Sequence, residues 1–353
     1  MTSYSFSKVL KREPGWYAGD FHVHTNTSHD GENSPAELAG FAQTEGLDFL
    51  AITDHNTIDG FPEIDENLEF LFIPGIEVTL SKGHFNVFGM EDWRSWMEDI
   101  TVSQKALPLP DKYQSVSDLM RLIAEEGLVS SINHPLLHPW NWHFEKTDLN
   151  YVHCVELWND LYWPDNDQAN PKTVELWTDW LNAGNRVTTI GGSDYHYPPK
   201  PERDLPGERL GQPTTHVYAE ELSTGSILEG IRKGRAYVSR GPQVAFQAAI
   251  GGKTYSIGDD LGEQYGEIEF TASISNQPKA FQAQLVRNGQ VNATEHLRGR
   301  KSSIKFNYKV EPASSSWFRL DVLALNGQVL AITNPIYANY RRNEISSIWD
   351  GAQ

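Results

Sequence analysis

Two short stretches near the N-terminus carry residue types that suit metal chemistry. Residues 19–25 contain His22 and His24, and residues 53–56 contain His55. The first stretch reads as a β-strand, in which alternate side chains lie on one face, so His22 and His24 point the same way. Two imidazoles that project together from a strand are a good start for a metal site, although either could instead be a buried strand histidine bonded to backbone.

Further histidines and carboxylates recur where predicted strands end. Polar side chains from several parallel strands converge at one face in a closed or nearly closed barrel, or at a switch point in an open sheet. Nine residues form the candidate ligand set: His22, His24, Asp30, His55, Glu77, His84, His134, Asp194 and His196.

The composition of this set indicates which metals it suits. Six imidazoles and three carboxylates without a thiolate favour Zn²⁺, Mn²⁺ or Fe²⁺ over a structural zinc clip. Nine ligands exceed the needs of one ion, so we expect two or three divalent ions, with Glu77 as the bridging carboxylate. Such ions lower the pKa of a bound water and hold the anionic oxygens of an attacked centre.

The elements that would position these residues follow an alternating pattern. Helices are predicted at residues 35–45, where Ser34 and Glu37 form a capping box and Gly46 is the stop, and at 117–126 and 173–183. The alternation predicts parallel βαβ units. Strands are predicted at residues 16–24, 47–53, 70–78, 84–89, 128–133, 152–157, 187–192 and 214–219.

The pattern changes after residue 242. Short alternating runs follow, separated by Gly, Asn and Pro, and they predict a small antiparallel β-sandwich. We therefore expect two domains, residues 1–242 with insertions near 91–113 and 136–170, and residues 243–353. The runs are residues 244–250, 267–274, 280–287, 302–310 and 317–324.

Bulk properties restrict the partners. The formal net charge of −18 argues against nucleic acid or an anionic membrane, although a small anionic substrate is compatible with bound cations. No apolar run approaches the roughly 18 residues of a membrane-spanning helix, and the first residues lack the order of a signal peptide. Cys154, the single cysteine, fits a reducing cytoplasm, where we expect this protein, and a buried inert thiol. The oligomeric state stays open.

Six short motifs occur in a recognisable order. They are His22-Val23-His24-Thr25, Ser28-His29-Asp30-Gly31, Thr53-Asp54-His55-Asn56, Gly75-Ile76-Glu77, Asn133-His134-Pro135 and Ser193-Asp194-Tyr195-His196. This series resembles the motifs of the PHP (polymerase and histidinol phosphatase) superfamily, and residues 75–86 with the trailing β-module look most like its CehA/McbA branch. The resemblance covers residues 16–240 and implies an α/β fold, a distorted (β/α)7 TIM-like barrel with a di- or trinuclear site.

The resemblance also implies how the ligands are shared. His22, His24, Glu77 and Asp194 would hold one metal, Glu77, His84 and His134 a second, and Asp30, His55 and His196 a third. In relatives the ligand of the second motif corresponds either to His29 or to Asp30, and we prefer Asp30.

The implied activity is that of a metal-dependent hydrolase. The main hypothesis is a phosphoesterase in which a metal-bridging hydroxide attacks a small phosphate mono- or diester, with Glu77, Asp194 and His196 as catalytic residues. Hydrolysis of a carbamate, ester or amide at the same site is the alternative, and a non-catalytic scaffold is the third. Arg240 and Asn159 are candidate substrate-binding residues.

Several other residues have two readings. Asp54 is expected to orient a ligand, and Glu156 and Asn159 either face the site or are ordinary loop residues. Trp140, Trp142, Trp158 and Trp163 either wall the pocket or pack in the core. Lys82 and Arg235 are expected to be solvated, and His138, His143, His153, His216 and His296 match no motif and are expected to be structural.

Overall fold

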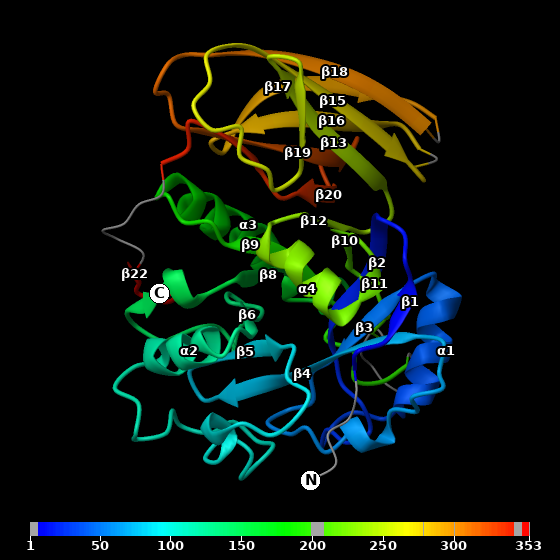
Figure 1. Ribbon diagram of the computed structural model, residues 1–353, viewed down its shortest axis with the longest axis vertical. Coiled ribbons are helices and arrows are strands. Elements are labelled where there is room, and N and C mark those ends of the chain that lie inside the picture. The colour runs from blue at the N-terminus through cyan, green and yellow to red at the C-terminus, as the bar shows by residue number, and fades with distance from the viewer. Residues whose placement is uncertain (1–5, 199–207, 278, 300, 342–347, 353) are drawn as a thin grey trace.

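The fold is described from a computed structural model that covers residues 6–198, 208–277, 279–299, 301–341 and 348–352 (Figure 1). An α/β region occupies the lower part of the view and a β-rich region the upper part. The α/β region contains β1 (Val9–Lys11), β2 (Gly15–Val23), α1 (Pro35–Glu45), β3 (Phe49–Ile52), η1 (Phe61–Glu63), β4 (Leu71–Leu80), β5 (Gly83–Phe88), η2 (Ser95–Met97), α2 (Val116–Glu125), β6 (Val129–Ile132), β7 (Thr147–Asp148), η3 (Leu149–Tyr151), β8 (Cys154–Asn159), α3 (Asn166–Asn182), β9 (Thr188–Gly192), β10 (Thr214–Ala219), β11 (Leu222–Ser223), α4 (Thr224–Arg232) and β12 (Ala236–Ser239).

Most predicted elements of this region are present at nearly the predicted bounds. Helix α1 has the expected capping box between Ser34 and Glu37, and Gly46 ends it in the left-handed conformation, with φ of 76°. Helix α3 begins at Asn166 rather than at residue 173, and Pro171 lies inside the helix. Helix α4 was not predicted.

The main sheet runs in the order β17-β16-β19-β20-β12-β10-β2-β3-β4-β5-β6-β8-β9. Strands β2, β3 and β4 are parallel, as are β6, β8 and β9. The prediction of parallel pairing is wrong for β5 and β10, which pair antiparallel with their neighbours. Only Ser81 and Lys82 connect β4 to β5, and so short a connection permits only a hairpin.

The curled sheet brings its last parallel strand back to its first. Just after β9, Tyr195 forms a parallel bridge with Val23 at the end of β2. The backbone N–H of His24 donates to the carbonyl of Tyr195 at 2.8 Å. The carboxyl ends of the strands therefore gather at one place. A (β/α)7 barrel in full stays a prediction, since four α-helices are found among the described residues.

The β-rich region follows β12 and continues the main sheet. Strand β20 pairs with β12, so the sheet crosses the boundary that we predicted between residues 242 and 243. That domain division and a separate β-sandwich stay predictions. The region contains β13 (Gln243–Ile250), β14 (Lys253–Ser256), β15 (Gly266–Ser275), β16 (Phe281–Arg287), β17 (Gln290–Leu297), β18 (Lys301–Val310), β19 (Ser316–Ala324), β20 (Val329–Thr333) and β21 (Ile336–Ala338). Strand β22 (Ile348–Trp349) pairs with β7 of the α/β region.

A second, four-stranded antiparallel sheet, β14-β13-β15-β18, packs in this region. Its inward side chains Phe246 and Phe270 share one buried apolar cluster with Phe318 and Leu320 of the main sheet. All five predicted strands of the region are present, as β13, β15, β16, β18 and β19. None of the described helices combines the length and the apolar character that crossing a bilayer requires.

Asp20 holds the closure between β2 and β9 together. Its side chain is 0% exposed, and Oδ1 accepts hydrogen bonds from the backbone N–H of His22 (3.2 Å) and Ser193 (2.9 Å). Oδ2 accepts from the N–H of Gly211 at 2.8 Å. Burial raises the pKa of Asp20 to about 6, although the hydrogen bonds from these three N–H groups act to lower it. The carboxylate therefore depends on the hydrogen bonds to stay ionised.

We expect Asp20→Asn to destabilise the protein by about 2 kcal/mol, because its amide would face a backbone N–H and leave a buried donor unsatisfied. Urea unfolding measures the change. Asp65→Asn is the matched control, since Asp65 also accepts a backbone N–H but is exposed. Equal stability of the two variants would contradict the role of Asp20.

Candidate metal centre

Glu77 of β4 lies at the middle of the candidate ligands. Its side chain is buried, at 0% exposure, and five imidazoles surround the carboxylate. The nearest nitrogens are Nδ1 of His55 at 2.7 Å, Nδ1 of His84 at 3.2 Å and Nε2 of His22 at 3.4 Å. Nε2 of His24 and Nε2 of His134 lie at 3.6 Å. One carboxylate is therefore within reach of ligands from several different strands.

Eight of the nine predicted ligands gather in three overlapping groups, in each of which one donor atom per residue lies within 4.8 Å of the others. Asp194 joins the second group through Oδ1, which lies 3.1 Å from Nε2 of both His22 and His24. The groups are His24, Asp30, His55 and His196; His22, His24 and Glu77; and Glu77, His84 and His134. The implied division of ligands stays a prediction, and the groups differ from it by the presence of His24 beside Asp30.

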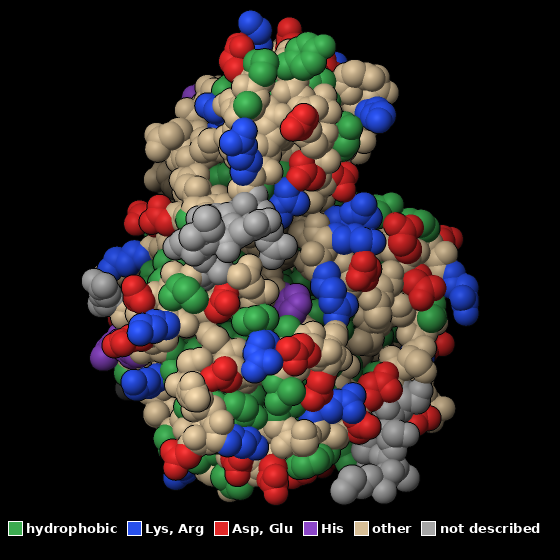
Figure 2. Space-filling view, turned by 60° about the vertical axis from the view of Figure 1, so that its left-hand side comes forward, with side chains coloured by type: hydrophobic (Ala, Val, Ile, Leu, Met, Phe, Trp, Pro, Cys, Tyr) green, Lys and Arg blue, Asp and Glu red, His purple; other side chains and the backbone are tan. Residues whose placement is uncertain are grey.

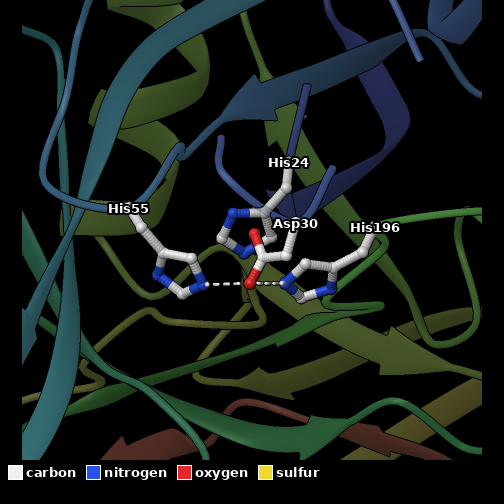
Figure 3. Close-up of side chains that lie close together, drawn as sticks. All are labelled: His24, Asp30, His55 and His196. Carbon is white, nitrogen blue, oxygen red and sulfur yellow. Dashed lines mark ion pairs between the residues drawn. The ribbon is translucent and has the colours of Figure 1, made fainter. Parts of the chain in front are cut away.

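Figure 3 shows the group around Asp30, whose carboxylate lies between the rings of His55 and His196. Its Oδ2 is 3.4 Å from Nε2 of His55 and 3.7 Å from Nε2 of His196. His29, the alternative to Asp30, has a 41% exposed side chain and belongs to none of the groups. The structure thus places Asp30 in the cluster in preference to its neighbour.

The donor atoms fit divalent cations. Nδ1 of His22 lies 3.0 Å from Oε1 of Glu156, which fixes Nδ1 as the N–H donor. Nε2 of His22 is buried and, within the described ranges, has no hydrogen-bond partner, although carboxylate oxygens of Asp194 and Glu77 lie beside it. A nitrogen lone pair that lies among carboxylate oxygens is electrostatically unfavourable unless a positive charge lies between them.

The pKa directions express the same demand for positive charge. Burial opposes ionisation of Glu77, but the imidazoles of His22, His55 and His84 outweigh it and hold the pKa of Glu77 well below its usual range. Burial likewise opposes protonation of His22, yet Asp194, Glu77 and Glu156 raise its pKa. At His22 the carboxylates thus stabilise positive charge against the cost of burial, whereas burial lowers the pKa of His24 to about 3 and also lowers that of His84.

The backbone at the strand ends is strained where it presents these ligands. His134 and Asp194 have φ of 28° and 52°, in the left-handed region that bulky residues avoid, and Asn56, next to His55, has φ of 48°. Each such residue costs about 1–3 kcal/mol, which the surrounding packing must offset. At Gly192 an added Cβ would collide with the side chains of His22 and Glu156, so only glycine lets β9 approach β2 there.

Comparison with known proteins agrees with this arrangement of residues. Residues 20–138 match the PHP domain. No curated protein matches the chain. Beyond residue 138, His196 belongs to the group of Asp30, and Oδ1 of Asp194 lies 3.1 Å from Nε2 of both His22 and His24.

The fold recurs in a crystal structure of a two-domain protein from Bacteroides vulgatus, described as containing a predicted PHP-like metal-dependent phosphoesterase. It is 18% identical in sequence and has a TM-score of 0.51, over 95% of this chain and 99% of that one. The lesion-specific endonuclease EndoQ from Pyrococcus furiosus is 18% identical with a TM-score of 0.46, over 62% of this chain and 56% of its own. The CehA/McbA branch is not distinguished by these similarities.

Buried polar residues hydrogen-bond to several of the candidate ligands. Glu156, 3% exposed, lies beside Nδ1 of His22 and accepts from the backbone N–H of His134 at 2.8 Å and from Asn159 at 3.1 Å. Asn133 donates to Oε1 of Glu77 at 2.9 Å. Glu156 and Asn159, left open by the sequence, thus face the site.

Asp54 lies outside the three groups and contacts the turn that follows His24. Its oxygens accept from the N–H of Thr25 at 2.6 Å and from the hydroxyl of Thr25 at 2.8 Å. It therefore fixes the backbone directly after the ligand candidate His24.

A cavity of about 290 Å³ opens onto the centre. Its lining residues are Asp30, His55, Glu77, His84, His134, Leu137, Trp140, Asn159, Asp160, Trp163, Asp194, His196, Tyr197 and Glu208. Trp140 and Trp163 wall the cavity, whereas Trp142 and Trp158 are core residues, at 0% and 5% exposure. Arg240 is not among the lining residues, so the structure does not support its predicted contact with substrate.

Two further carboxylates, Asp160 and Glu208, line the cavity and were not predicted. Glu208 accepts from the backbone N–H of His196 and, at 3.2 Å, from that of Tyr197, so it fixes the loop that carries His196. No pattern around residue 208 signals this contact. Asp160 directly follows β8 and could have been found by the same strand-end rule that found the ligands.

We expect Glu77→Ala to lower bound metal by more than one ion per chain, because two of the three groups lose their shared carboxylate. Elemental analysis of protein purified without chelators measures the content. Far-UV circular dichroism and thermal unfolding check that the variant folds. Full metal content in the folded variant would contradict a shared ligand.

We expect Glu156→Gln to weaken metal retention by about 10- to 100-fold, because the amide would place a donor against either the N–H of His134 or Nδ1 of His22. Competition with a chelator measures the affinity. The ¹⁵N shifts of His22 report its tautomer, which a merely structural role of Glu156 would not change. Glu175→Gln, at an exposed position of α3, is the control.

Proposed function

We propose that the protein is a metal-dependent phosphoesterase that hydrolyses a small phosphate mono- or diester. The observation that carries the proposal is the convergence of three histidine and carboxylate groups on one cavity, two of which share Glu77. Closely spaced cations that share a ligand suit phosphoryl transfer, because they can hold both the attacking and the leaving oxygen. The PHP domain match supports the same chemistry.

Two or three divalent ions, Zn²⁺, Mn²⁺ or Fe²⁺, would be held as the groups indicate: by His22, His24, Glu77 and Asp194; by Glu77, His84 and His134; and by Asp30, His55 and His196. When bound, they supply Lewis acidity toward the phosphoryl oxygens and lower the pKa of a water. Glu77, Asp194 and His196 line the cavity, where we assign them the catalytic roles.

Other residues that line the cavity orient the ligand side chains and limit the access of water. Asn159 lines the cavity, and its Nδ2 donates to Glu156 at 3.1 Å and approaches Oδ2 of Asp194 at 3.4 Å. It thereby orients a ligand carboxylate, and its position also allows contact with substrate. Leu137, Trp140 and Trp163 cover the cavity with apolar surface that limits access of water.

A small molecule is the partner that the cavity admits. Its volume of about 290 Å³ is at the lower end of small-molecule sites. The net charge of −18 disfavours nucleic acid and anionic membranes, and we propose a cytoplasmic location. A carbamate, ester or amide hydrolase of the CehA/McbA kind would use the same groups, and the substrates in the following test separate it from a phosphoesterase.

The proposal predicts turnover of an aryl phosphate or an aryl phosphodiester that is lost on chelation and restored by Mn²⁺ or Zn²⁺. An aryl carbamate is assayed in parallel with the same protein. Activity on the carbamate alone would reject the phosphoesterase and favour the alternative. If the protein binds no metal even after Mn²⁺ or Zn²⁺ is added, both hydrolase hypotheses are rejected and the non-catalytic scaffold remains.

A further inference from the structure

One edge of β9 is held by side chains from other parts of the fold. Strand β9 is the last strand in the order of the main sheet, and its pairing with β8 is irregular between Glu156 and Trp158. Buried backbone N–H and C=O groups need hydrogen-bond partners, so the edge that faces away from β8 must find them elsewhere. Strand β9 leads directly to Asp194 and His196. The contacts that hold this edge therefore also place two candidate ligands.

Asn334 contacts this edge as the backbone of a neighbouring strand would. Its Oδ1 accepts from the backbone N–H of Thr189 at 2.8 Å, and its Nδ2 donates to the carbonyl of the same residue at 2.9 Å. Nδ2 also donates to the carbonyl of Ala236 in β12 at 3.0 Å. The side chain is 1% exposed. One amide from the β-rich region thus joins two strands of the α/β region.

The backbone around Asn334 is itself held in place. Asn334 follows β20, which pairs with β12, and its own N–H donates to the carbonyl of Ala236 at 3.1 Å. Pro335 comes next and restricts the residue before it to extended conformations. The β-rich region rises above the α/β region in both views, and β20 lies beside β12 where the two meet (Figure 1 and Figure 2). The amide therefore reaches β9 from a fixed segment.

Thr215 of β10 holds the next position along the same edge. Its hydroxyl accepts from the N–H of Gly191 at 2.7 Å and donates to the carbonyl of Gly191 at 2.9 Å. The N–H of Ser193, two residues further, donates to Asp20 at 2.9 Å. Alternate N–H groups of a strand lie on one edge, so these contacts form a continuous row with that of Asn334. The row ends one residue before Asp194.

Asp194 depends on the placement of β9. Its Oδ1 lies 3.1 Å from Nε2 of both His22 and His24, and its backbone has φ of 52°. A residue in the left-handed region keeps that conformation only where the surrounding structure holds it. A shift of β9 relative to β2 would change the distance from this carboxylate to both imidazoles.

We propose that Asn334 and Thr215 are positioning residues of the metal centre, which set the place of Asp194 through β9. The β-rich region then takes part in metal binding, because it supplies Asn334. The inference rests on the metal groups of the proposed function and does not depend on which bond is hydrolysed.

The first test compares Asn334→Asp with wild type. The new carboxyl group keeps an oxygen that accepts from Thr189, but its second oxygen would face the carbonyls of Thr189 and Ala236. We expect the affinity for Mn²⁺ to fall about tenfold, measured by competition with a chelator at a temperature where the variant is folded. An added negative charge would by itself strengthen cation binding, so a loss reports displacement of β9.

Asn339→Asp is the matched control. Asn339 is buried, at 8% exposure, and in the same way accepts from the N–H of Gln264 at 2.7 Å and donates to its carbonyl at 2.8 Å. Both residues lie in the β-rich region and outside the metal groups. Asn339→Asp should therefore lower thermal stability but leave the Mn²⁺ affinity of the folded protein unchanged. A merely structural role of Asn334 would have that same result.

A second pair of variants tests this edge from within the α/β region and decides the question if Asn334→Asp does not fold. Thr215→Val has nearly the same shape but loses both hydrogen bonds to Gly191, whereas Thr215→Ser keeps the hydroxyl. We expect weaker Mn²⁺ binding in Thr215→Val and wild-type affinity in Thr215→Ser. In an Asp194→Asn background, Thr215→Val should have no further effect, because both changes act on one ligand.

The outcomes separate this inference from the proposed function. Unchanged Mn²⁺ affinity in folded Asn334→Asp or in Thr215→Val, or an equal loss in Asn339→Asp, overturns the positioning role. A wild-type protein that binds Mn²⁺ but hydrolyses no phosphate ester overturns the phosphoesterase alone, and the measured affinities still support or reject the positioning role. A wild-type protein that binds no metal overturns both.

Discussion

The burial of one carboxylate among five imidazoles is the interaction on which the rest of this structure depends. Glu77 is fully shielded from water, and its ionisation relies on nearby positive or polarised groups. Those groups come from β2, β5 and the ends of β3 and β6, so the strands must reach one another at this point. The sheet must therefore curve far enough to bring the imidazoles of these strands around the buried carboxylate of Glu77.

Buried polar contacts hold the end of β2 against the end of β9. Asp20 joins the backbones of His22, Ser193 and Gly211, and Gly192 leaves room for His22 and Glu156. Positive φ at His134 and Asp194 shows that the backbone is bent away from its preferred conformation at two ligand positions. Packing of the scaffold offsets this strain, which is a common property of sites that must present side chains in fixed directions.

Sequence reasoning found residues that the fold brings together, because strand periodicity and strand ends are local signals. His22 and His24 share a face by spacing alone, and the capping box at Ser34 is visible in the sequence. The antiparallel β5, the contact of Glu208 with His196 and the pairing of β20 with β12 were not predictable, since each depends on how distant segments meet. Arg240 was chosen for its charge, but only the fold shows that it lies outside the cavity lining.

The account makes Glu77 a ligand shared between two ions. A crystal structure of the protein loaded with Mn²⁺ or Zn²⁺, with anomalous difference maps, tests this most directly. The account predicts at least two anomalous peaks, each within about 2.0–2.2 Å of a Glu77 oxygen, one near His22 and His24 and one near His84 and His134. A single peak, or two peaks of which neither contacts Glu77, would contradict it.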